Sequence, residues 1–83
     1  MTKNASLSIS PNQVPLNASL MVRSESDNFP ANAYTITDEK GRVIRKGSVS
    51  ERVTEFRLSM VGLATGVYRF TMGPVHERFT IVL

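Results

Sequence analysis

The sequence contains no cysteine among its 83 residues. A disulfide framework, a thiolate nucleophile and a cysteine-ligated metal are therefore excluded. Small secreted domains usually rely on disulfides, so the absence of cysteine favours a cytosolic protein. A domain that must remain free of disulfide cross-links while it crosses a membrane would lack cysteine too. The absence of cysteine leaves the compartment open.

Long apolar runs are also missing. No run approaches the roughly 20 residues that a membrane helix needs, so we expect no transmembrane segment. The first six residues lack the apolar centre of a signal peptide. The protein is therefore either cytosolic or a piece of a longer precursor, in which case Met1-Thr2-Lys3 is an expression start. We interpret residues 1–6 as a linker or as expression-derived residues, and residues 7–83 as one domain.

Residue patterns that support catalysis are few. His76-Glu77 begins like the zinc motif H-E-x-x-H, but Thr80 stands at the fifth position and the segment alternates like a strand. Asp38-Glu39 lies in a turn and lacks the further oxygen ligands of a calcium loop. There is no G-x-S-x-G elbow, no phosphate-binding glycine loop, and one histidine only. We predict no catalytic residue, no cofactor and no metal, and hence no enzyme.

Period-two alternation of apolar and polar residues, bounded by turn residues, runs through the whole chain. It predicts seven strands, at residues 5–10, 17–24, 31–38, 42–49, 53–59, 67–72 and 77–83. The side chains predicted to face inward are Leu7, Ile9, Leu20, Val22, Tyr34, Ile36, Phe56, Leu58, Tyr68, Phe70, Met72, Phe79, Ile81 and Leu83. Short strands with a turn about every ten residues are typical of an immunoglobulin-like fold. We therefore expect an all-β protein, a seven-stranded immunoglobulin-like antiparallel β-sandwich.

The formal net charge is +3, and much of the basic charge falls between residues 40 and 46, at Lys40, Arg42, Arg45 and Lys46. One interpretation is a solvated edge whose cations discourage edge-to-edge pairing. The other is a docking patch for an anionic partner such as phosphate, nucleic acid or lipid head groups. Nucleic acid is the weakest of these, because nearly all the aromatic residues fall on predicted buried faces and leave few stacking platforms. We therefore expect no nucleic-acid partner.

Five motif elements follow one another along the chain. They are Pro11-Asn12-Gln13 before Leu20-Met21-Val22, a strand with Tyr34, the turn Asp38-Glu39-Lys40-Gly41-Arg42-Val43 with Gly47, the element Leu63-Ala64-Thr65-Gly66-Val67-Tyr68, and the closing Arg78-Phe79-Thr80-Ile81-Val82. In this order and spacing they resemble the type A C-terminal sorting domain of the type IX secretion system, with which certain Gram-negative bacteria export proteins to the cell surface. Gln13 stands where that family has a second proline.

The resemblance implies a sandwich at the end of a larger protein, read by the outer-membrane secretion machinery. A sortase-like peptidase commonly removes such a domain at its N-terminal junction and attaches the cargo to a surface lipopolysaccharide. The parent protein would pass through the periplasm to the outer-membrane surface or the medium. The alternative is a non-cleaved envelope adhesion or signalling module that binds a partner protein. A fibronectin-like or carbohydrate-binding accessory domain is a third hypothesis, which predicts exposed aromatic residues on a flat face, and the sequence offers few. We assign partner recognition to Lys40, Gly41, Arg42, Arg45, Lys46, Gly66, Tyr68 and Arg78.

Overall fold

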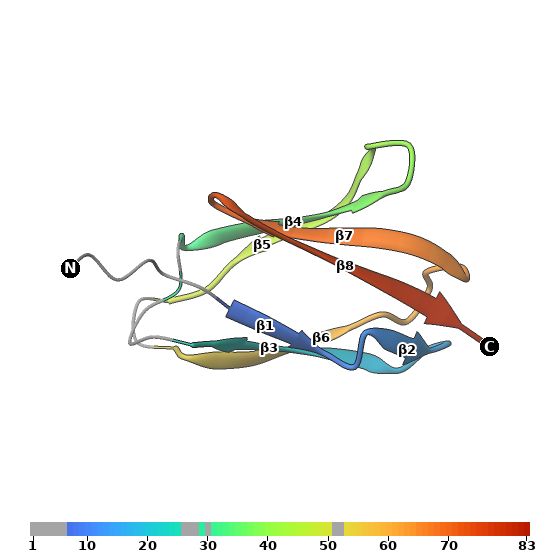
Figure 1. The fold of residues 1–83 in the computed structure, drawn as a ribbon, viewed down its shortest axis with the longest axis horizontal. Coiled ribbons are helices and arrows are strands. Elements are labelled where there is room, and N and C mark those ends of the chain that lie inside the picture. The colour runs from blue at the N-terminus through green and yellow to red at the C-terminus, as the bar shows by residue number, and fades with distance from the viewer. Residues whose placement is uncertain (1–6, 26–28, 30, 51–52) are drawn as a thin grey trace.

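The computed structural model describes residues 7–25, 29, 31–50 and 53–83, and these residues form eight β-strands and no helix. The strands are β1 (Leu7–Ser10), β2 (Gln13–Pro15), β3 (Ser19–Ser24), β4 (Ala33–Asp38), β5 (Val43–Ser48), β6 (Glu55–Ser59), β7 (Gly66–Met72) and β8 (Val75–Val82). They build a three-stranded sheet in the order β1-β3-β6 and a five-stranded sheet in the order β2-β8-β7-β4-β5. The two sheets lie one above the other (Figure 1). The all-β prediction is confirmed.

All seven predicted ranges overlap a strand of the structure, although residues 5 and 6 of the first range lie outside the described residues. The residues predicted as the linker, 1–6, also lie outside them. No helix within the described residues is long and apolar enough to cross a membrane. The strand count of seven is wrong by one, because the described residues include an eighth strand that the sequence did not predict.

The additional strand is β2, and it also corrects the expectation of a purely antiparallel arrangement. It pairs in parallel with the end of β8, with Val14 opposite Ile81. The Leu16 N–H donates to the Val82 carbonyl at 2.7 Å. Three residues are too few for an alternation signal, and Pro15 indicates a break rather than a strand. At the edge of a sheet a proline is tolerated because its missing N–H is not needed for the ladder.

The core lies between the two sheets and includes side chains from both. Its buried apolar residues are Leu7, Ile9, Val14, Leu20, Val22, Ile36, Met60, Tyr68, Phe70, Met72, Phe79 and Ile81. Three further predicted inward residues, Tyr34, Phe56 and Leu58, are half-buried and pack against this core. Leu83 contradicts the prediction, because it is 96% exposed. It follows Val82, the last paired residue of β8, so no neighbouring strand covers it.

Aromatic rings connect the two sheets. Phe56 belongs to β6 of the three-stranded sheet, whereas Tyr34 and Phe70 belong to β4 and β7 of the five-stranded sheet. The Tyr34 ring stacks on both phenylalanines with centroid distances of 5.5 Å. Phe29 adds an edge-to-face contact with Phe56 at 5.3 Å. Such pairs contribute about 0.5–1.5 kcal/mol each beyond the area that they bury.

Gly47 lies beneath the Tyr34 ring. The two residues are cross-strand partners on β5 and β4. A Cβ atom on Gly47 would lie 2.5 Å from the Tyr34 hydroxyl oxygen and 2.7 Å from the ring carbon Cζ. These separations are shorter than any van der Waals contact, so only glycine leaves room for the ring at this position.

Deletion of residues 79–83 is expected to unfold the protein. It removes Phe79 and Ile81, which contribute about 1.5–3 kcal/mol each when buried. It also removes the part of β8 that pairs with β2. The two side chains together contribute about 3–6 kcal/mol, which is comparable to the lower part of the range of about 5–15 kcal/mol that is typical of the total stability of a native domain. Circular dichroism checks this, with deletion of Leu83 alone as the matched control; a folded 79–83 deletion would contradict the core described above.

Gly47→Ala is expected to lower the unfolding free energy by about 1–3 kcal/mol, as overpacking in a filled site does. The Tyr34 ring cannot move away easily, because it is stacked on Phe56 and Phe70. Urea denaturation followed by fluorescence measures the change. Ser48→Ala, at the exposed neighbouring position, is the control and should have little effect. Equal stability of the two variants would show that the ring relocates freely.

Candidate recognition surface

Two adjoining hollows lie where the β4–β5 turn meets the start of β7. The larger one, the sheet hollow, measures about 380 Å³ and is lined by Thr37, Asp38, Glu39, Gly41, Val67, Tyr68, Arg69 and Arg78. The smaller one, the turn hollow, measures about 110 Å³ and is lined by Asp38, Glu39, Lys40, Arg42, Thr65, Gly66, Val67 and Tyr68. The β4–β5 hairpin projects beyond the rest of the five-stranded sheet (Figure 1). Together the residues of the two hollows form the recognition surface.

The β4–β5 turn is held by the Asp38 carboxylate. Its Oδ1 accepts hydrogen bonds from the backbone N–H groups of Lys40 at 2.9 Å and Arg42 at 3.0 Å. Its Oδ2 accepts from Arg42 Nε at 2.9 Å. Gly41 has a φ of 83° and donates its N–H to the Asp38 carbonyl at 2.9 Å. The tight turn predicted from the sequence is confirmed, with aspartate at its start and glycine at its end.

These contacts change the acidity of Asp38. The backbone N–H of Arg42 lowers the pKa of the carboxyl from its ordinary value of 3.8, the guanidinium of Arg42 and the N–H of Lys40 lower it further, and partial burial opposes them. A carboxyl whose pKa is lower in the folded state stabilises the fold when it is ionised. The stabilisation is therefore fully present above pH 3.8 and disappears as the pH falls through the lowered folded-state pKa.

Tyr68 fixes the other wall of the surface. Its ring is buried and stacks on Phe79 with a centroid distance of 5.6 Å. Its hydroxyl donates to the Ala64 carbonyl at 2.7 Å, which ties the start of β7 to the segment before it. Gly66, between them in the sequence, has a φ of 151°, a conformation that favours glycine. Tyr68 and Gly66 thus give the surface its shape.

The structure brings six of the eight predicted recognition residues to this surface. Gly41, Tyr68 and Arg78 line the sheet hollow, and Lys40, Arg42, Gly66 and Tyr68 line the turn hollow. Arg45 and Lys46 lie outside both hollows, on β5. The predicted stretch of four basic residues is thus divided between two places.

Arg45 has a structural partner that the sequence did not indicate. Its guanidinium donates to the carbonyl of Ser59 at 3.3 Å and to the carbonyl of Val61 at 2.8 Å. Arg45 belongs to the five-stranded sheet, and Ser59 ends β6 of the three-stranded sheet. The side chain therefore connects the two sheets at the side where β5 and β6 are edge strands. Lys46, the next residue, is exposed.

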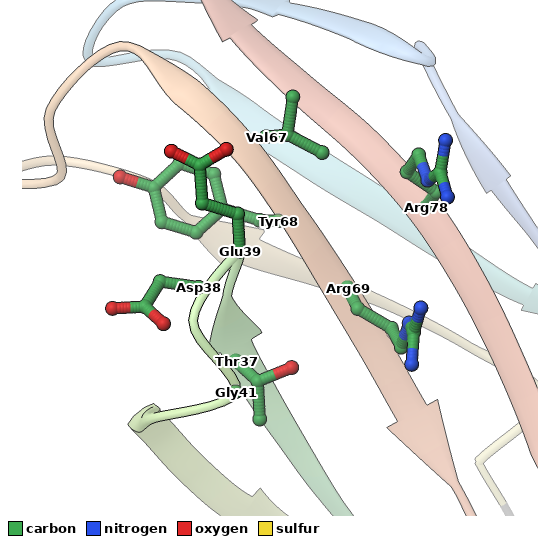
Figure 2. Close-up of a pocket in the computed structure, with 8 residues that line it drawn as sticks. All are labelled: Thr37, Asp38, Glu39, Gly41, Val67, Tyr68, Arg69 and Arg78. Atoms are coloured by element: carbon green, nitrogen blue, oxygen red, sulfur yellow. The ribbon is translucent and has the colours of Figure 1, made fainter.

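Sequence reasoning missed Arg69, which lines the sheet hollow together with Arg78 (Figure 2). The two arginines are direct cross-strand partners on β7 and β8, and Thr37 of β4 is the partner of Arg69 on the other side. Alternation along β7, in which Tyr68 and Phe70 are buried, implies that Arg69 points outward. It could not reveal which strands are neighbours, and that order is what places the three residues in one row.

The surface presents charged and hydrogen-bonding side chains, and hydrogen bonds of Asp38 and Tyr68 hold the backbone that carries them. Within the described ranges no group of three or more histidine, cysteine, aspartate or glutamate side chains could hold a metal ion. His76, considered above as a possible zinc ligand, has its Nδ1 at 3.1 Å from Thr71 Oγ1. A polar surface that hydrogen bonds hold in shape is suited to binding a partner.

Asp38→Asn is expected to lower the melting temperature at pH 7, because the amide cannot form the ion pair with Arg42. The difference from the unsubstituted chain should shrink as the pH falls below 3.8, where the carboxyl of the unfolded chain is already protonated, and vanish once the folded carboxyl is protonated too. Thermal melts between pH 7 and pH 2 measure this convergence. A difference that does not depend on pH would show that the charge of Asp38 does not stabilise the turn.

Comparison with known proteins does not assign this surface to a family. No protein-family model matches the sequence, and no curated protein matches it significantly. What supports a function is therefore the resemblance of the sequence motifs, together with the place of those motifs in the fold.

Proposed function

We propose that this protein is a sorting domain of the type IX secretion system, which directs its parent protein across the outer membrane to the cell surface. One observation carries the proposal. The Asp-x-x-Gly-Arg turn and the Leu-x-x-Gly-Val-Tyr element lie far apart in the sequence, yet Arg42 and Gly66 line the same hollow. A signal that a receptor recognises in the folded state requires its motif residues to lie together on one surface.

A second pair of motif residues supports the same proposal. Tyr34 and Gly47 are both elements of the motif series, and they are cross-strand partners. The ring fills the space that a side chain at Gly47 would need. The presence of both residues therefore has a physical reason, because each determines what can stand at the other position. Two elements of the motif series are thus in contact in the fold, which is expected of a family signature.

The finer fold assignment, an immunoglobulin-like sandwich, is also part of this proposal. In that fold the strands are lettered in chain order, and sheets containing A-B-E and G-F-C face each other. If β1, β3 and β6 are A, B and E, then β8, β7 and β4 are G, F and C, in the observed order, with β5 in the C′ place. The bond from the Tyr68 hydroxyl to Ala64 supports the assignment, because it corresponds to the tyrosine corner near the start of strand F.

A partner would recognise the folded surface through groups that the fold leaves exposed. Lys40 and Thr65 are exposed, line the turn hollow and come from the two different motif elements. The cargo would precede this domain in the precursor, and a sortase-like peptidase would act at the junction, which falls on residues outside the described ones. In this proposal the secretion machinery binds the recognition surface, and the peptidase cleaves on the N-terminal side of the domain.

The proposal predicts that a reporter with a signal peptide and residues 1–83 at its C-terminus reaches the surface or the medium of a type IX host. The double variant Lys40→Glu/Thr65→Glu should remain folded and reduce export about tenfold or more, because it changes the charge of the turn hollow. Arg57→Glu, on the exposed face of β6, is the matched control and should be exported normally. Export is measured by protease accessibility of the reporter and by fractionation.

Three outcomes distinguish the hypotheses. Retention of the folded fusion in the periplasm would overturn the proposal. Export that also occurs in a strain without the type IX machinery would overturn it as well. Export followed by retention of the uncleaved domain at the surface would support type IX recognition and favour the non-cleaved envelope module as the final state.

A further inference from the structure

The outer face of the five-stranded sheet contains a pair of like charges in direct opposition. Arg69 on β7 and Arg78 on β8 are cross-strand partners, and both are exposed. They point away from the core, because Tyr68, Phe70 and Phe79 next to them in the sequence are buried. Within the described part of the chain, neither guanidinium has an ion-pair or hydrogen-bond partner.

This arrangement is unfavourable for the fold alone. Like charges placed directly opposite one another destabilise an antiparallel pair, whereas opposite charges stabilise it. The same chain pairs Arg23 with Glu55 across β3 and β6 at 3.7 Å, so the favourable solution occurs on its other sheet. Removing either positive charge would relieve the repulsion. Binding of an anionic ligand by both guanidinium groups would explain why the chain has an arginine pair that does not stabilise the fold.

The sheet hollow gives such a ligand a place. Figure 2 shows the guanidinium groups of Arg69 and Arg78 at one end of the hollow and the carboxylates of Asp38 and Glu39 at the other. Asp38 is neutralised by Arg42, whereas Glu39 has no ion-pair partner among the described residues. The arginine end therefore attracts an anion, and Glu39 limits how far the negative charge of the ligand extends along the hollow.

Thr37 adds a hydrogen-bonding group to the arginine end. It is the cross-strand partner of Arg69, so the row across three strands is threonine, arginine, arginine. The Cα atoms of partners in such a row lie about 4.5–5.5 Å apart. Two arginine side chains that leave neighbouring strands at this Cα spacing can reach different oxygens of one tetrahedral oxyanion, and the planar two-donor geometry of the guanidinium suits phosphate.

We propose that Arg69 and Arg78, with Thr37, form a binding site for a phosphate group in the sheet hollow. The phosphate can belong to a lipid headgroup or to a small soluble molecule, and the chemistry of recognition is the same. This inference goes beyond the proposed export function and does not depend on it, because it rests on the register of β7 and β8 and on the unpaired charges.

The test uses the full chain and inorganic phosphate, followed by NMR shifts of the backbone amides and by thermal melts at constant ionic strength. The amides of β7 and β8 around the two arginines should shift on titration, and phosphate should raise the melting temperature. Arg69→Gln/Arg78→Gln should weaken binding at least tenfold. Without phosphate it should melt at the same or a higher temperature than the unsubstituted chain, because the repulsion is gone.

Arg57→Gln removes the same type of charge from β6 and should bind phosphate normally. Glu39→Gln should bind inorganic phosphate more tightly, because it removes the negative charge at the far end of the hollow. Unchanged affinity of the double arginine variant, or equal losses in that variant and Arg57→Gln, would overturn the site.

Vesicles identify the source of the phosphate. Binding to phosphatidic acid vesicles, lost in the double arginine variant and absent with phosphatidylcholine vesicles, assigns a lipid headgroup. Binding of inorganic phosphate without vesicle binding assigns a soluble ligand, and absence of both overturns the proposal. The two proposals fail separately: an exported double variant that no longer binds phosphate leaves the sorting function intact, and a retained fusion that binds phosphate leaves the site intact.

Discussion

The register of β7 against β8 is the constraint on which the rest of this structure depends. It places Tyr68 opposite Phe79 and Phe70 opposite Glu77, so that the buried rings of the hairpin fall on the inner face. The same register sets Arg69 opposite Arg78 on the outer face. Because side chains alternate with a period of two, a slip by one residue would turn every one of them to the wrong side. Core and candidate site are consequently fixed by a single pairing.

The two hollows arise from backbone features that the core supports. The Asp38 carboxylate closes the β4–β5 turn, and the Tyr68 hydroxyl ties the start of β7 to Ala64. Both are local hydrogen bonds, but Tyr68 also packs its ring on Phe79 within the core. The shape of the surface is thus tied to core packing on one side and to the turn on the other. A change in the core near Phe79 would be felt at the surface.

Alternation along the strands was enough to predict the all-β class, most strand positions and nearly the whole inner face, because burial on one side of a sheet imposes period two. It could not predict β2, whose three residues depend on pairing with β8. Nor could it show that Arg45 binds the carbonyls of Ser59 and Val61, since that contact joins two sheets. The alternating pattern continues through Leu83 and predicts it inward, although the strand pairing ends one residue earlier. The local sequence pattern is therefore sufficient to predict the strands, whereas the residues of the candidate site become apparent only from the order of the strands in the sheet.

The separation of the motif elements along the chain has a consequence for recognition. The pairing of β4 with β7, with Asp38 opposite Tyr68, brings the β4–β5 turn and the start of β7 together. An extended or partly unfolded chain does not present the turn hollow. A receptor that reads this surface, as proposed, therefore tests the folded state and the sequence at once. The margin of stability of so small a protein is narrow. One side chain, Tyr68, both stacks on Phe79 in the core and ties the start of β7 to Ala64 at the surface, so a loss of core packing would remove the proposed recognition surface at the same time.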